Sequence, residues 1–160
     1  MERKRGYLRT AENDYLYLVD DYERNHFGNP FCFHSQNICE RYLKHVVDVY
    51  CSDDDKTDVL KTHSLRKLVR YIQKNLPELQ CDWNSVLKAD GFYFNTRYPG
   101  EDYIEVTEED CADCWEAVLV VRSAVNSYCT EKAKIPAKAV VESQTFTDLI
   151  NSFDDKTMLQ

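Results

Sequence analysis

Hydrophobic residues recur along most of the chain at intervals of three and four positions, the spacing typical of amphipathic helices. The clearest stripe lies in residues 64–76 and consists of Leu65, Leu68, Val69, Ile72 and Leu76. Pro77 ends this helix, because proline cannot continue a helix. Similar stripes predict helices over 10–25 and 30–51, and the second has so wide an apolar face that we expect it to be the central helix.

The second half of the chain predicts two more helices and a looser tail. Asp82 is a good cap for a segment from Trp83 to about residue 98, although Gly91 interrupts it. Thr107 and three acidic residues open a long last helix, because carboxylates suit the positive end of a helix dipole. We expect an exposed turn at 52–58, and no segment shows the clear alternation typical of a strand. The prediction is an all-α, up-and-down bundle of four or five helices at 1–130, with a C-terminal extension at 131–160 that holds a short helix near 146–153.

Composition agrees with one ordinary folded domain. The chain has 160 residues, of which 43% are hydrophobic and 30% charged. No apolar run reaches the roughly 18 residues that span a bilayer, and the charged N-terminus does not resemble a secretory signal. These features predict a cytoplasmic protein without a membrane segment. The net charge of −8 disfavours binding of nucleic acid over the whole surface.

Seven scattered cysteines without an export signal indicate reduced thiols. We expect four of them to be small core residues: Cys32, Cys39, Cys81 and Cys129. Cys111 and Cys114 form a single Cys-x-x-Cys pair on a helix. A structural zinc site needs four ligands and redox pairs of this kind follow a strand, so we predict neither a metal nor a cofactor.

The predicted central helix carries Gln36, Glu40 and Lys44 four residues apart, in one polar stripe. The stripe either lines a cleft or dimer seam, or forms a buried network that fixes the packing. His63, at the start of the next helix, either orients a phosphate or caps the helix, and we favour capping.

Positive charge gathers in residues 61–75, which contain five lysines and arginines and no acidic residue. Lys67, Arg70 and Lys74 lie opposite the leucine stripe, with Arg66 beside them. They form either a phosphate-binding face or, as we favour, an ordinary solvated surface. Arg97 and Tyr98 precede Pro99, which fixes the local backbone. Arg97 either binds an anion or nucleotide, or ends a helix by bonding to its carbonyl groups, and we favour the second.

Three segments together resemble the HEPN domain family (higher eukaryotes and prokaryotes nucleotide-binding) over about residues 11–128. "CFHSQNICERYLKHVV" matches the family's second helix at Phe33, Gln36, Glu40, Leu43 and Lys44, with Arg41 in place of the usual lysine. "KTHSLRKL" resembles its Lys-Thr-His-Asp-Leu segment, with Ser64 in place of the aspartate. "YFNTRYPG" with "TEEDCADCWEAV" resembles its Tyr-x-x-x-Arg-Tyr-Pro stretch and closing helix.

The resemblance implies a homodimeric helical bundle that binds a nucleotide or RNA, often beside a minimal nucleotidyltransferase in toxin–antitoxin or defence systems. Some members are metal-independent RNases with an Arg-x4–6-His motif, which this chain lacks: no histidine lies five to seven residues after an arginine. We therefore predict no catalytic residues. The candidate nucleotide- or anion-binding residues are Gln36, Glu40, Lys44, His63, Arg97 and Tyr98. The alternatives are an endoribonuclease with a non-standard site built from Arg97, His63 and Tyr98, and a structural partner that acts through its C-terminal tail.

Overall fold

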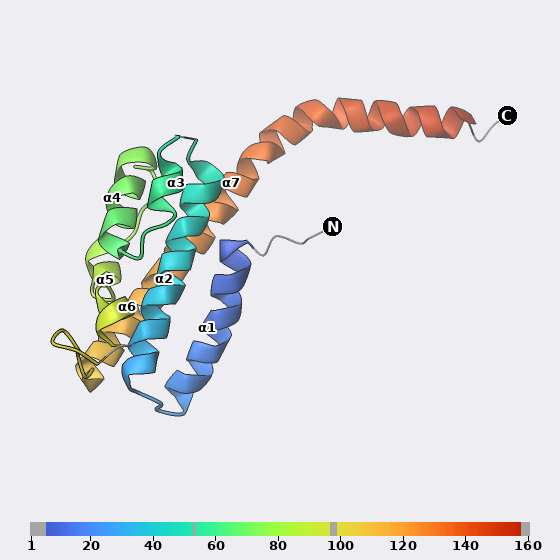
Figure 1. The fold of residues 1–160 in the computed structure, drawn as a ribbon. Helices are drawn as coiled ribbons and strands as arrows, with labels where there is room; N and C mark the ends of the chain where they lie inside the picture. The colour runs from blue at the N-terminus through green and yellow to red at the C-terminus, as the bar shows by residue number, and fades with distance from the viewer. Residues whose placement is uncertain (1–5, 53, 97–98, 158–160) are drawn as a thin grey trace. The chain divides into compact units, whose positions relative to one another are not determined.

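The computed structural model describes residues 6–52, 54–96 and 99–157, with residues 135–157 described by their backbone alone. The described residues form helices and connections without any strand. The helices are α1 (Tyr7–Glu23), α2 (Asn29–Tyr50), α3 (Lys56–Val59), α4 (Leu65–Asn75), α5 (Trp83–Leu87), α6 (Phe92–Asn95) and α7 (Glu108–Thr157) (Figure 1). The predicted all-α helical architecture is confirmed. The chain divides into two compact units, residues 1–125 and 126–160.

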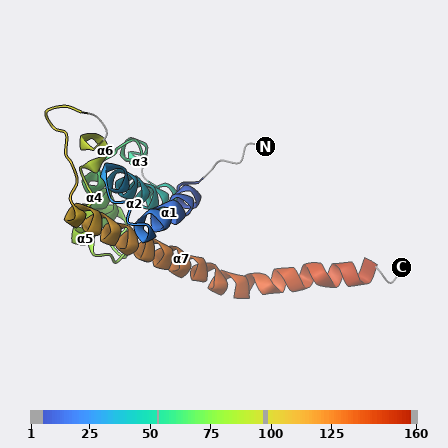
Figure 2. The same cartoon turned by 90° about the horizontal axis from the view of Figure 1, so that it is seen from below.

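Helix α2 is the centre of the first unit. It packs against α1, α4 and α6, and the view along the helices shows neighbours around it (Figure 2). Twelve of its residues are buried, among them Phe31, Ile38, Leu43 and Val47, whereas Val49 in the last turn is exposed. The prediction of a central helix is therefore correct, and the wide apolar face is explained by packing on several sides.

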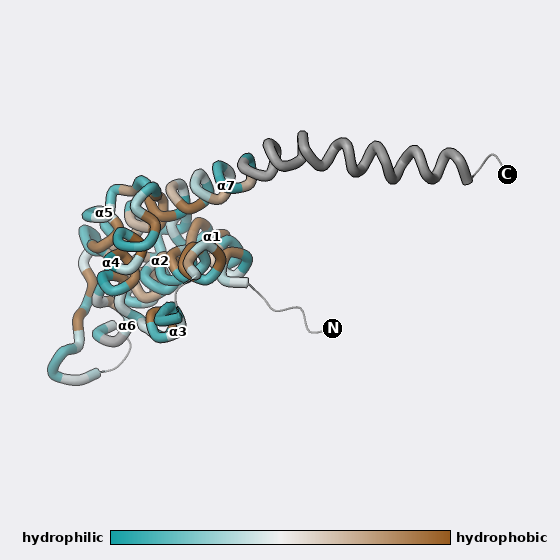
Figure 3. The backbone as a smooth tube through the Cα atoms, turned by 90° about the horizontal axis from the view of Figure 1, so that it is seen from above, coloured by the Kyte–Doolittle hydropathy of each residue, from teal (hydrophilic) through white to brown (hydrophobic). Residues whose placement is uncertain are grey.

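Helix α4 follows its predicted pattern closely. All five residues of its apolar stripe are buried, and hydrophobic positions alternate with hydrophilic ones along the tube in Figure 3. The Ser64 hydroxyl accepts a hydrogen bond from the Lys67 backbone N–H at 3.3 Å and so caps the helix. The helix ends at Asn75, just before Pro77, as the sequence predicts.

On the other side of α2, aromatic rings join α1 to the first turns of α7. Tyr22 stacks on Trp115 with ring centroids 4.2 Å apart, and Phe31 of α2 lies 6.4 Å from the same indole. Close to them, Glu12 accepts hydrogen bonds from the Tyr42 hydroxyl at 2.9 Å and from Arg122 at 3.2 Å. These contacts fix the positions of three helices relative to one another.

Several expectations differ from the structure. The segment expected as one helix from Trp83 to residue 98 is broken into α5 and α6 around Gly91, whose φ of 95° lies in the left-handed region. The turn expected at 52–58 includes the short helix α3. Helix α7 is continuous from Glu108 to Thr157, whereas a separate short helix was expected near 146–153. The division at residue 130 stays a prediction.

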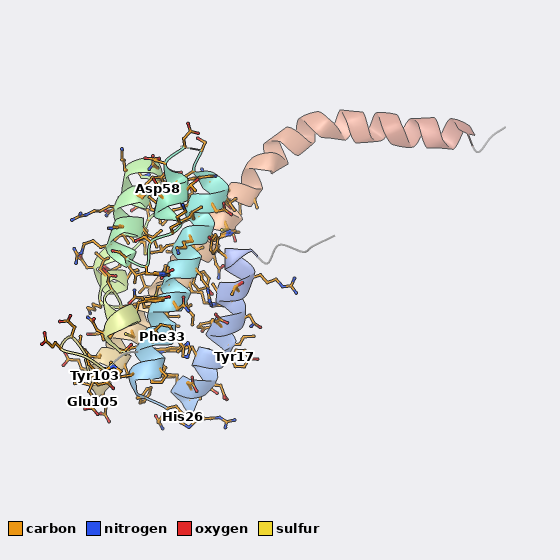
Figure 4. All side chains as sticks on the ribbon, viewed as in Figure 1. Tyr17, His26, Phe33, Asp58, Tyr103 and Glu105 are labelled. Atoms are coloured by element: carbon orange, nitrogen blue, oxygen red, sulfur yellow. The ribbon has the colours of Figure 1, made fainter. Side chains whose placement is uncertain are left out.

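The Asn29-Pro30 pair predicts Asn29 as the N-cap of the central helix, because asparagine is a preferred cap and proline suits the first turn, but Gly28 occupies that position without a side-chain bond. The Asn29 side chain instead holds the segment before α7. Its amide donates to the Ile104 carbonyl at 2.8 Å and to the Tyr103 hydroxyl at 3.0 Å, and its oxygen accepts from the Val106 N–H at 2.9 Å. Figure 4 labels Tyr103 in this segment. Across the part of the chain that the structure describes, no helix is long and apolar enough to cross a membrane.

Candidate functional site

A cavity of about 420 Å³ lies where α2 meets the loop before α4 and the turn before α6. Its walls combine residues from three distant parts of the sequence. They are Gln36, Thr62, His63, Ser64, Asp90, Gly91, Tyr93 and Asn95. The cavity therefore depends on how α2, α4 and α6 pack together.

The polar stripe of α2 forms a buried network next to this cavity. Gln36, Glu40 and Lys44 are only 1%, 4% and 6% exposed. The Lys44 ammonium donates to Glu40 Oε1 at 2.7 Å, so the two buried charges neutralise one another. Buried ion pairs need such close partners, because each charge loses its hydration. The stripe is therefore a buried network, and of its three residues only Gln36 lines the cavity. A dimer seam along the stripe stays a prediction.

His63 connects the network to the cavity. Its Nδ1 lies 3.1 Å from Glu40 Oε1, and its ring stacks on Tyr93 with centroids 4.0 Å apart and planes within 9°. The side chain remains 42% exposed. The favoured interpretation of His63 as the cap of α4 is wrong, because Ser64 performs that role. His63 instead presents a positioned imidazole at the mouth of the cavity.

The Gln36 amide has one satisfied end and one unsatisfied end. Its Nε2 donates to the His63 carbonyl at 2.8 Å, whereas Oε1 is buried and receives no hydrogen bond from any described residue. The His63 carbonyl can only accept, so it fixes which end of the amide faces it. An unpaired buried acceptor is costly, and Gln36 is therefore the residue in the cavity wall that most requires a donor.

Asp90 occupies the N-terminus of α4 from within the cavity wall. Its Oδ1 accepts from the Leu65 N–H at 3.0 Å, which places a carboxylate at the positive end of the helix dipole. With the Ser64 hydroxyl on Lys67 N–H, two of the first free N–H groups of α4 already have acceptors. Side chains of the protein itself therefore satisfy these two N–H groups at the start of α4.

Beyond the cavity, the outer side of α4 is basic. Arg66, Lys67, Arg70 and Lys74 are all exposed, and within the described residues none of them is in an ion pair. Four unpaired cations within about three turns of helix make a local positive surface on an acidic protein. Phosphate binding by this surface stays a prediction.

Arg97 and Tyr98 lie outside the described residues. Their described neighbours are tied to the base of α2, since the Asn29 amide also donates to the Thr96 carbonyl at 3.3 Å and Ile104 N–H donates to the Asn95 carbonyl at 2.7 Å. The interpretation of both residues as nucleotide or anion contacts remains a prediction.

A second cavity, of about 430 Å³, lies between α1 and α2. Arg41 and Asp14 form an ion pair within its wall, and partial burial lowers the pKa of Arg41. Tyr17 also lines it and projects from α1, with 71% of its surface exposed (Figure 4). Asp21 in the same wall contacts His26, and none of the described wall residues carries a buried polar atom without a hydrogen-bond partner as Gln36 does.

The thiols lie mainly in the core. Cys32 and Cys39 are buried as expected, whereas Cys81 and Cys129 are only partly buried. Cys111 and Cys114 are buried as well. Cys32 Sγ lies 3.7 Å from Cys111 Sγ, and burial raises the pKa of Cys111 to about 12. A protonated, buried thiol is a poor nucleophile. Among the described residues, no group of three histidine, cysteine or acidic side chains is arranged to hold a metal.

Sequence reasoning found Gln36 and His63 but missed two other wall residues, Tyr93 and Asp90. Tyr93 is the first tyrosine of the Tyr-x-x-x-Arg-Tyr-Pro resemblance, and this position could have singled it out. Asp90 carries no signal in the sequence, because its partner Leu65 lies 25 residues away.

The family comparison agrees with this architecture. The family model for the HEPN domain matches residues 5–128, which is most of the chain and almost all of the first compact unit. The protein therefore belongs to the HEPN domain family. Searches of the curated proteins and of the solved structures found no match.

Proposed function

We propose that this HEPN-domain protein is a nucleotide- or RNA-binding module, with its ligand in the cavity between α2, α4 and α6. The observation that carries the proposal is the wall itself. It combines a stacked imidazole and phenol with a buried amide whose acceptor is unpaired. Aromatic stacking and a few convergent polar groups are the usual means of holding a base.

The basic side of α4 supports the same function. It begins directly after Ser64, which lines the cavity, so the phosphates of a bound nucleotide or strand would find cations close by. We expect Arg97 and Tyr98 to contribute to the same site. We further expect a cytoplasmic homodimer that works with a second protein such as a minimal nucleotidyltransferase, in a toxin–antitoxin or defence system.

Fluorescence anisotropy with a labelled single-stranded RNA of about 12 nucleotides tests the proposal. The double variant Lys67→Ala/Arg70→Ala should weaken binding at least about tenfold and reduce its salt dependence, since two phosphate contacts are lost. The matched control is Arg9→Ala/Arg24→Ala, which removes two exposed arginines of the α1 region and changes the net charge equally. Equal binding by both double variants, or no binding by the wild type, would refute the proposal.

The same RNA also tests the endoribonuclease alternative. His63 is the described residue that could transfer a proton, because its ring is held by Glu40 and reaches solvent. Cleavage of the RNA that disappears in His63→Ala and Arg97→Ala would support an enzyme. An intact RNA after prolonged incubation would leave the binding module as the function.

A further inference from the structure

The lining of the α2–α4–α6 cavity suits hydrogen-bond donors better than it suits a phosphate. No lysine or arginine lines it, and its one acidic side chain is Asp90. Asp90 Oδ1 is bonded to Leu65 N–H, whereas Oδ2 is in no hydrogen bond with a described residue. Together with Gln36 Oε1, the wall presents two unpaired acceptors. A phosphate placed here would meet a carboxylate and no cation.

The usual anion site of a helix is also closed at this point. Asp90 and Ser64 already accept from the first backbone N–H groups of α4. A phosphate would therefore compete with a carboxylate that belongs to the protein. The cations that suit phosphate lie outside the cavity, on the exposed side of α4.

The aromatic rings around the cavity form a row that includes His63. Phe33 lies 5.4 Å from Tyr93, and Tyr93 stacks on His63 at 4.0 Å. His63 is partly exposed, so a planar heterocycle can stack against the exposed part of its ring. Stacking orients such a ring with its polar edge toward the wall, where the acceptors lie.

We propose that the cavity is a base-recognition site that selects nucleobases carrying an exocyclic amino group, while the phosphates remain outside on α4. This inference rests on the proposed function and specifies its ligand. One amino group supplies two N–H donors, the number of unpaired acceptors in the wall. Gln36 Oε1 is buried in this structure, so a ligand that bonds to it also opens the wall locally.

The first pair of ligands in the test differs by the amino group alone, whereas in the second pair a carbonyl replaces the amino group and N3 gains a proton. The affinities of adenosine monophosphate and purine riboside monophosphate are measured by isothermal titration calorimetry, and cytidine and uridine monophosphates form a second pair. We expect the amino-bearing member of the first pair to bind about tenfold more tightly, because its rival leaves the buried Gln36 Oε1 and the Asp90 carboxylate oxygen without a donor. The His63 ring signals in NMR spectra should shift during the same titration.

Two variants locate the effect. Gln36→Met keeps the side-chain length but removes the acceptor, and should reduce the preference to less than about threefold. Asp90→Asn keeps an oxygen for Leu65 N–H and replaces the second acceptor with a donor, so it should weaken the preference in the same direction. Thermal unfolding monitored by circular dichroism shows whether each variant is folded. If Gln36→Met does not fold, Asp90→Asn alone tests the preference.

The outcomes separate this inference from the proposed function. Equal affinity within each nucleotide pair, with binding still weakened by Lys67→Ala/Arg70→Ala, would overturn base selection and leave nucleotide binding intact. A preference that persists unchanged in both cavity variants would place recognition elsewhere and also overturn it. No binding of any nucleotide or RNA would overturn both.

Discussion

Helix α2 carries a polar network on each of two nearly opposite sides, and the two differ in what they face. Gln36, Glu40 and Lys44 lie on the side of the cavity, whereas Tyr42 turns toward Glu12 and Arg122. At 100° per residue, Tyr42 is roughly 160° from the centre of the first stripe. Both networks join helices, and each contains a buried polar atom without a described partner, Gln36 Oε1 in the first and Arg122 Nε in the second. Only the first network borders one of the two cavities described here.

This contrast separates two uses of buried polarity. The Glu12 network is packed between α1, α2 and α7, and the Arg122 guanidinium lies 4.2 Å above the Tyr15 ring. Its effect is to fix how these helices meet. The Glu40 network fixes His63 beside a space that a ligand can enter. The cavity beside the Glu40 network is what supports the proposed binding site, whereas the Glu12 network has packing contacts alone.

The largest expected effect comes from removing one carboxylate on each side. Glu40→Ala leaves Lys44 as an unpaired buried charge and should lower the free energy of unfolding by roughly 3–5 kcal/mol. Glu12→Ala is the matched substitution, and it should cost less because Glu12 and Arg122 are each about one-third exposed. Urea unfolding followed by circular dichroism measures both. Similar losses of stability for the two variants would contradict the expectation that the more deeply buried carboxylate contributes more.

A smaller effect should separate stability from binding. Tyr42→Phe removes the hydrogen bond to Glu12 and should cost about 1 kcal/mol of stability, with nucleotide and RNA affinity unchanged. Tyr93→Leu should do the reverse, because it removes the ring that supports His63 at the cavity. Chemical unfolding and calorimetric titration of the two variants provide the readouts. Weaker binding by Tyr42→Phe would contradict the division of roles between the two sides.

The smallest effect concerns the thiols of the packed region and appears only at high pH. Burial raises the pKa of Cys39 and raises that of Cys111 to about 12, so the folded state holds these protons more tightly than the unfolded chain. Their contribution is complete below the unfolded pKa and is lost as the pH rises toward the folded pKa. With an unfolded pKa of 9.0, stability should fall by about 0.4 kcal/mol per buried thiol at pH 9, as measured by urea unfolding between pH 7 and 10. A flat profile would show that these thiols titrate alike in both states.

Local pattern was sufficient for the main helices of the first unit. The stripe of α4 was read directly from Leu65, Leu68 and Ile72, because burial of one helical face repeats at a fixed interval. The same logic failed in 83–98, where Gly91 adopts a left-handed conformation and divides the segment. It also failed for Asn29, whose side chain has partners more than 60 residues away.

By itself, the sequence determined the helical class, the HEPN resemblance and the polar stripe on α2, since each depends on spacing within one segment. Only the tertiary structure decided that His63 contacts Glu40 across 23 residues and stacks on Tyr93 across a further 30. It likewise placed the Asp90 carboxylate on the start of α4. Such contacts depend on the packing of one helix against another, and the residues that make them leave no periodic trace along the chain.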